Sequence, residues 1–252
     1  MPELPVSVRL ALWVTHAWQS GSPVEDAVAA ATPDADDVNV DLGWLDGLAA
    51  LGERCLLVAL PGPGRTATLP GCTDEVRREA LDARECAYAP TLGGMIIPRI
   101  STYGPTGDQG CRIDLVSVTA DPVPAHRVDG LDARAADRRL RAAVAEVTQA
   151  LDMSPGRPFD ATLRADAESG GRAWALPRCL PARLAESLAR AATVERIARV
   201  GVAHAASALT AAAADSRTTQ LSRLRAEADS ALAEIASVAA LAISRSSPAA
   251  RS

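Results

Sequence analysis

The chain contains no lysine: all 26 of its basic side chains are arginine. A lysine amine is needed for Schiff-base catalysis, for linkage to pyridoxal phosphate and for a Walker-type phosphate loop. Arginine stays protonated and does not replace it as a nucleophile. The absence therefore excludes these chemistries. A GC-rich, bacterial genome accounts for it, together with the 53 alanines and the single asparagine, Asn39.

Aromatic residues are also scarce, at 3% of the chain, so the core must be built largely from Leu, Val, Ile and Ala. Few aromatic side chains also leave few stacking platforms for single-stranded nucleic acid. The net charge of -5 is unevenly divided, because residues 1–131 carry -9 and residues 132–252 carry +4. Neither half has the dense basic face of a nucleic-acid-binding protein, so we expect no nucleic-acid partner.

Metal-binding patterns are missing too. The five cysteines show no CxxC pair or repeated interval, and we interpret them as reduced thiols packed as small hydrophobic residues. His16, His126 and His204 have no Cys, His or acidic neighbour at metal-ligand spacing. We therefore predict no metal and no cofactor.

No segment resembles a signal peptide, and no apolar run reaches the roughly 20 residues that span a bilayer. We expect a cytoplasmic protein without membrane association.

Two segments match ligand-binding motifs only by their letters. Residues 62–67 fit the dinucleotide pattern GxGxxG/A, but Leu69-Pro70-Gly71 stops the helix that the pattern requires. Residues 37–41 begin like a calcium loop, but Leu42 and Leu48 stand where glycine and glutamate are needed. We interpret the first as a turn and the second as a capping and solvating acidic stretch.

Hydrophobic periodicity and turn residues predict an α+β fold. We expect an amphipathic helix over 5–18 and a short helix to residue 31 after a capping box at Ser22 and Glu25. Further helices are predicted over 42–51 and 74–85. Strands over 54–60, 86–88, 95–103 and 111–119 would form a small antiparallel sheet. Pro98 should lie on an edge or beside a bulge, because proline cannot donate a ladder hydrogen bond.

After residue 131 the pattern becomes helical. Asp132 is the expected cap of a helix with a stripe at Leu140, Val144, Val147 and Leu151. Apolar residues from Leu221 to Ala242, spaced three and four apart, predict a helix that packs along its length. Its expected partner is 194–214, in an antiparallel hairpin with a turn at 215–219. We therefore predict an α+β part over 1–131, a helical part over 132–245 and a disordered tail over 246–252, with one continuous domain as the alternative.

The apolar stripe of the predicted helical hairpin favours a non-catalytic interaction or adaptor protein. Its C-terminal helices would bind a protein partner or a second copy of the chain.

The alternative function is small-anion binding or an enzyme. It rests on seven residues within one stretch of 29: Arg99, Tyr103, Asp108, Arg112, Asp114, His126 and Arg127. Arginines on a sheet edge can bind carboxylate or phosphate, and histidine can supply acid-base chemistry. Ion pairs across a solvated sheet edge are the simpler interpretation of the same residues. An enzyme should bring His126 and two of these arginines together in a concave pocket.

A third hypothesis is a winged-helix DNA-binding regulator, because three short helices precede a strand. The acidic residues around the third helix oppose it, since they would repel phosphates: Asp34, Asp36, Asp37, Asp41 and Asp46.

Overall fold

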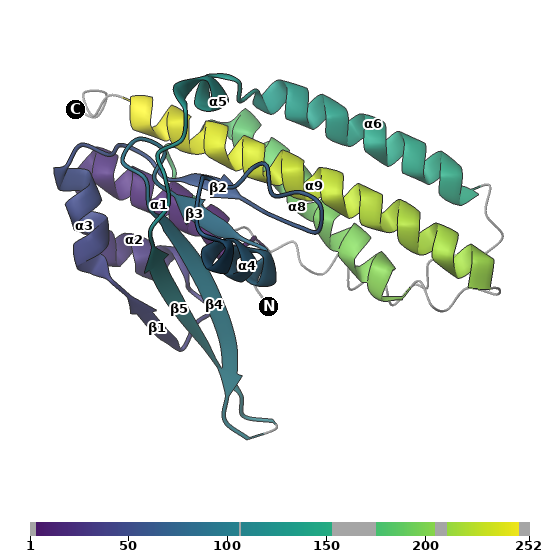
Figure 1. Cartoon of the computed structure of the whole chain (residues 1–252), viewed down its shortest axis with the longest axis horizontal. Helices are drawn as coiled ribbons and strands as arrows, with labels where there is room; N and C mark the ends of the chain where they lie inside the picture. Colours follow the sequence, from purple (N-terminus) through teal and green to yellow (C-terminus); the bar gives the residue numbers. More distant parts are fainter. Residues whose placement is uncertain (1–3, 106, 153–174, 205–210, 247–252) are drawn as a thin grey trace. The chain divides into compact units, whose positions relative to one another are not determined.

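The computed structural model describes residues 4–105, 107–152, 175–204 and 211–246 (Figure 1). The fold is α+β, as predicted, with a five-stranded mixed sheet and long C-terminal helices. Two compact units can be distinguished. The first contains Met1–Leu131, Ala175–Pro181 and Ala236–Ser252, and the second contains Asp132–Trp174 and Ala182–Ile235. The predicted tail lies outside the described residues from 247 onward.

Helix α1 (Val6–Ser20) is buried around most of its circumference. The prediction of an amphipathic helix is wrong in this respect, because Ser7, Arg9 and Thr15 are buried as well. The reason is that α1 contacts strands of the sheet as well as helix α2 (Val24–Ala31), so little of its surface is left to water. Thr15 satisfies its hydroxyl by accepting a hydrogen bond from the Leu56 N–H at 3.0 Å.

The start of α1 is capped from a distant part of the chain. Pro5, at the N-cap position, makes no side-chain hydrogen bond. The Glu85 carboxylate instead accepts a hydrogen bond from the Ser7 N–H at 2.7 Å, which satisfies a backbone donor that the helix itself leaves unpaired. Burial raises the pKa of Glu85, and the hydrogen bonds at the helix terminus and the nearby Arg9 oppose that shift.

The sheet has the strand order β1-β5-β4-β3-β2. The strands are β1 (Asp37–Val40), β2 (Leu57–Ala59), β3 (Cys86–Tyr88), β4 (Met95–Tyr103) and β5 (Gly110–Val118). Strand β1 pairs with β5 in parallel, whereas the other pairs are antiparallel. The sheet is therefore mixed rather than antiparallel as predicted, because the sequence interpretation did not include β1.

Pro98 lies in the central strand β4, but at a place where β4 has only one neighbour. Strand β3 pairs with Met95 and Ile96, whereas Pro98 is opposite Leu115 of β5. The missing N–H thus falls beyond the end of β3, as expected for a residue that cannot donate to a ladder.

Local polar residues start two of the short helices. The Asp41 carboxylate accepts from the Trp44 N–H and caps α3 (Leu42–Ala50), and Thr73 caps α4 (Asp74–Ala83). The predicted capping box of α2 does not form, because Pro23 is its N-cap and the Ser22 hydroxyl lies 2.9 Å from that of Ser20. Residues 62–67 form the predicted turn, closed by a hydrogen bond from the Arg65 N–H to the Gly62 carbonyl. Helix α5 (Ala125–Asp129) was not predicted.

The second unit consists of helical segments: α6 (Ala133–Asp152), α8 (Ala182–Ala203) and the first part of α9 (Ala211–Arg245). A core cluster joins Ala143 and Val147 of α6, Ala198 of α8 and Leu224 of α9. The turn predicted at 215–219 is wrong, since these residues lie inside α9. Residues 205–210, between α8 and α9, are outside the described part.

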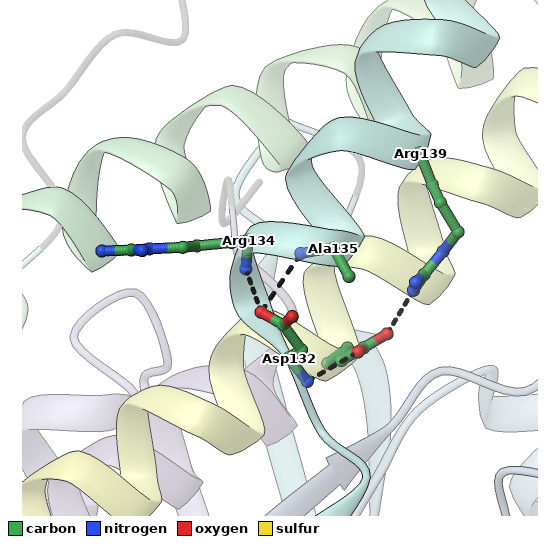
Figure 2. Close-up of polar contacts among 5 residues, drawn as sticks. Asp132, Arg134, Ala135 and Arg139 are labelled. Carbon is green, nitrogen blue, oxygen red and sulfur yellow. Dashed lines mark hydrogen bonds and ion pairs between the residues drawn. The ribbon is translucent and has the colours of Figure 1, made fainter.

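Asp132 caps α6, as predicted (Figure 2). Its carboxylate accepts from the Arg134 N–H at 2.8 Å and from the Ala135 N–H at 3.2 Å. These bonds lower the pKa of Asp132. Its own N–H donates to Glu234 of α9 at 3.0 Å, and Glu234 also pairs with Arg139. One carboxylate of α9 thus holds the beginning of α6.

Candidate functional site

The seven residues predicted as an anion or catalytic site are distributed over several places in the first unit. Only Arg112 and Asp114 are joined directly, with the Arg112 Nε 3.3 Å from the Asp114 carboxylate. Arg112 also pairs with Asp37 of β1 at 3.2 Å, and Asn39 donates to Asp114 at 3.2 Å. Two of these contacts run between β1 and β5, and the third lies along β5.

Arg99 stands opposite Asp114 in the β4–β5 register, but its guanidinium pairs with Glu79 of α4 at 2.7 Å. It lines a hollow of about 560 Å³ between α4 and β4, whose other charged residues are Glu75, Arg78, Glu79 and Asp82. His126 does not line this hollow. Mixed charges of both signs give the hollow no clear preference for a cation or an anion.

Tyr103 and Asp108 lie in the turn region between β4 and β5. Tyr103 is half-exposed, and its ring lies against Gly110, where a Cβ would come within 2.6 Å of the ring. The Asp108 N–H donates to the Pro105 carbonyl at 3.0 Å and closes a turn. Both residues therefore have roles in shaping this hairpin.

Arg127 and His126 lie on α5. The Arg127 guanidinium donates to the backbone carbonyls of Ala67 at 2.8 Å and Leu69 at 3.3 Å. It thereby anchors the chain after the Gly62–Arg65 turn. The His126 residue is exposed, and its backbone carbonyl accepts from the Gly130 N–H. Each of the three arginines named in the anion hypothesis thus has protein oxygens as partners.

No group of three metal-ligating side chains occurs within the described ranges. None of the helices described is long and apolar enough to span a membrane.

A groove with several apolar lining residues lies between helix α2 and the edge strand β1. Its volume is about 550 Å³. One wall is α2, with Val28 and Ala29, and another is β1, with Val38 and Val40. Three successive residues of β1, 38–40, line it. Because successive side chains of a strand point to opposite faces, this places the strand's main chain along the groove.

Strand β1 ends the sheet among the strands described, and β5 is its neighbour there. An edge strand presents main-chain N–H and C=O groups that are not used by the ladder. Val38 and Val40 are half-exposed, whereas Asp37 and Asn39 are exposed and contact charged residues of β5. The groove thus contains apolar side chains of a strand that has a single neighbouring strand among the residues described.

The surroundings of this groove are acidic. Between Arg9 and Arg54 the sequence has eight acidic residues and no basic one apart from His16. Glu25 lines the groove itself. Two arginines pair with acidic residues of this stretch, Arg9 with Asp34 and Arg112 with Asp37. The local charge is therefore negative after these pairs are formed.

A second group missed by the sequence analysis joins His16 and Cys179. The Cys179 Sγ lies 3.3 Å from the His16 Nδ1, although 163 residues separate them. Trp13 packs edge-on against His16 with ring centroids 6.0 Å apart, and its indole N–H donates to the Ala175 carbonyl at 2.7 Å. No spacing pattern in the sequence predicts this pair, because His16 and Cys179 lie in segments that are far apart along the chain.

Family models match nearly the whole chain in two successive pieces. Residues 7–130 match the N-terminal domain of Rv1486c-like proteins, and residues 134–233 match the C-terminal domain of the same proteins. Comparison with curated proteins and with solved structures gave no match. Because both domains of this family occur in order, the chain belongs to the Rv1486c-like protein family.

Proposed function

We propose that the chain is a non-catalytic interaction protein that binds an extended, basic segment of a partner protein along the free edge of β1. The observation that carries the proposal is the groove between α2 and β1, which places apolar side chains beside a strand edge that has no neighbouring strand within the described part of the chain. An extended segment that adds to a sheet edge gains affinity from main-chain hydrogen bonds and specificity from alternate side chains.

The proposal keeps the class of function expected from the sequence, an interaction protein, but assigns binding to a different surface. The sequence hypothesis used the apolar stripe of the C-terminal helix. Leu221, Ala228 and Ile235 of that stripe are each at most 2% exposed. A side chain buried in the chain's own core is not available to a partner, so β1 is the better candidate surface.

The acidic surroundings favour a partner segment that carries arginine or lysine. Positive side chains would be attracted to Glu25 and to the acids that flank β1, and this attraction speeds the encounter as well as setting specificity. A second copy of the same strand would bring Asp37 and its acidic neighbours close to their own counterparts. Like-charge pairing of that kind opposes a dimer through this edge.

The small-anion and enzyme alternative has less support. Its arginines are engaged by Glu79, by Asp37 and Asp114, and by two backbone carbonyls. An incoming anion would have to displace these partners.

Fluorescence polarisation with a short labelled peptide of alternating arginine and valine tests the proposal. We expect saturable binding that weakens with added salt, and much weaker binding of the matched glutamate-valine peptide. Two versions of the first peptide, N-methylated on alternate residues, probe the strand edge. Only one of the two should still bind, because alternate N–H groups face the edge.

Two variants with the same charge change locate the site. Ala29→Arg places a cation in the groove, whereas Ala50→Arg adds one at the exposed end of α3, outside the groove lining. Arginine is well tolerated in helices, so both should fold. We expect about tenfold weaker peptide binding for Ala29→Arg only. Equal binding by both variants would remove the groove from consideration, and a dimer lost in Ala29→Arg by sedimentation would make a second copy the occupant.

A further inference from the structure

We infer that Cys179, paired with His16, is a nucleophilic thiol that exchanges with small disulfides. The pair is independent of the β1 groove and of the function proposed for it. Its basis is the 3.3 Å contact between the Cys179 Sγ and the His16 Nδ1, which places a nucleophile and a base within hydrogen-bond reach.

The two segments that supply His16 and Cys179 are each fixed by further interactions. His16 lies on α1, and Trp13 of the same helix packs against its ring and binds the Ala175 carbonyl. Cys179 lies in a turn closed by the Leu180 N–H and the Pro177 carbonyl. Pro177 and Pro181 restrict the backbone on both sides of Cys179.

The surroundings favour the thiolate form. Transfer of the thiol proton to imidazole gives a thiolate beside an imidazolium, and the positive charge stabilises the anion. Arg178, the preceding residue, is exposed and adds a second positive charge nearby in the chain. Cys179 itself is half-buried, unlike the fully buried Cys55 and Cys86.

Other cysteines of the chain have different settings. Cys55 and Cys86 are buried, and burial raises the pKa of Cys55 to about 12 and that of Cys86 further. Burial also raises the pKa of Cys72. Cys111, on β5, is half-buried like Cys179 and is the natural internal reference.

The reaction is a thiol–disulfide exchange. The Cys179 thiolate attacks one sulfur of a low-molecular-weight disulfide, the disulfide bond of the reagent breaks, and a mixed disulfide forms on Cys179. The released thiolate takes the proton that His16 holds. Cys179 is oxidised and the released half of the reagent is reduced, so the disulfide is the oxidant and nothing else is required.

The test follows glutathione addition to each cysteine of the full chain by site-resolved mass spectrometry, with oxidised glutathione as the probe. A thiol of ordinary pKa should react about a hundredfold more slowly at about pH 5.5 than at about pH 7.5, because its thiolate fraction falls by that factor. We expect Cys179 to slow less than tenfold over this range, and to slow less than Cys111, the half-buried thiol used for comparison.

His16→Gln should give Cys179 the roughly hundredfold slowing of a thiol of ordinary pKa. Its rate at about pH 6 should fall about tenfold, after allowance for the weaker nucleophilicity of a more acidic thiol. His204→Gln, the same substitution at an exposed residue directly after α8, should leave the profile unchanged. A parent Cys179 as steep as Cys111 would overturn the inference, and this comparison needs no variant. A shallow profile retained in folded His16→Gln would also overturn it.

Discussion

At the scale of single residues, Arg9 shows how the fold tolerates a charge inside. It is 5% exposed, its Nη1 lies 3.3 Å from Asp34, and its Nε and Nη2 have no hydrogen-bond partner among the atoms described. Burial lowers the pKa of Arg9, and Asp34 opposes that shift. A buried ion that is incompletely paired contributes little net stability.

We therefore expect Arg9→Met to leave the free energy of unfolding unchanged or to raise it by about 1 kcal/mol, because methionine fills a similar volume without desolvating a charge. Asp34→Ala should lower it, since the buried guanidinium loses its counterion. Urea unfolding of both variants measures these changes in the free energy of unfolding, which should differ in sign. A marked loss of stability in Arg9→Met would indicate that its two unpaired nitrogens bind something in solution.

The sequence indicated individual residues only where the partners are close in the chain. Asp41, Thr73 and Asp132 each cap a helix that begins beside them, and such caps depend on local spacing. The partners of His16, Ser7 and Arg112 come from other segments, and nothing in the local pattern selects them. The arginines grouped at 99–127 were close in sequence but are used by different elements.

At the scale of elements, the cap of α6 predicts a pH dependence. The pKa of Asp132 is lower in the folded chain than in the unfolded one, so the group contributes stability above its unfolded value, about 3.9, and loses it as the pH falls through the folded value. We expect the difference in urea midpoint between the parent and Asp132→Ala to be constant above about pH 5 and to shrink below about pH 4.

Asp132→Asn is the matched control for this prediction. Its amide oxygen can still accept from the Arg134 and Ala135 N–H groups but does not titrate in this range. The difference in urea midpoint between Asp132→Asn and Asp132→Ala should therefore stay constant as the pH falls. If it shrinks in acid as much as the difference between the parent and Asp132→Ala does, the effect belongs to another group.

Elements were predicted where composition and periodicity agreed. Strands β3 and β4 have their predicted bounds, and β5 differs by one residue, because turn-rich segments delimit them. Strand β1 was missed because it is short and contains Asp and Asn, which are depleted in strands. The turn expected at 215–219 is helical because the polar residues there follow an alanine run and lead into buried Leu221 and Leu224.

At the scale of the whole molecule, the first unit is built from distant parts of the chain. It includes residues 236–245 of α9. The Val58 N–H of β2 donates to the Ser237 hydroxyl at 3.0 Å, and Ile243 is 1% exposed. A chain that ends at residue 235 should therefore lose cooperative unfolding of the first unit, as measured by circular dichroism and amide exchange. Ser237→Ala in the full chain should retain it, and a truncated chain with parent-like protection of β2 would refute this prediction.

This split composition also affects how the protein is made. On the ribosome, residues 1–131 emerge long before the residues of α9 that complete their core. At elongation speeds of about 5–20 residues per second, the interval is on the order of ten seconds. During that time the first unit lacks the residues of α9 that complete it, among them the buried Ile243. Newly synthesised chains should accordingly depend on chaperones more than the length of 252 residues alone would suggest.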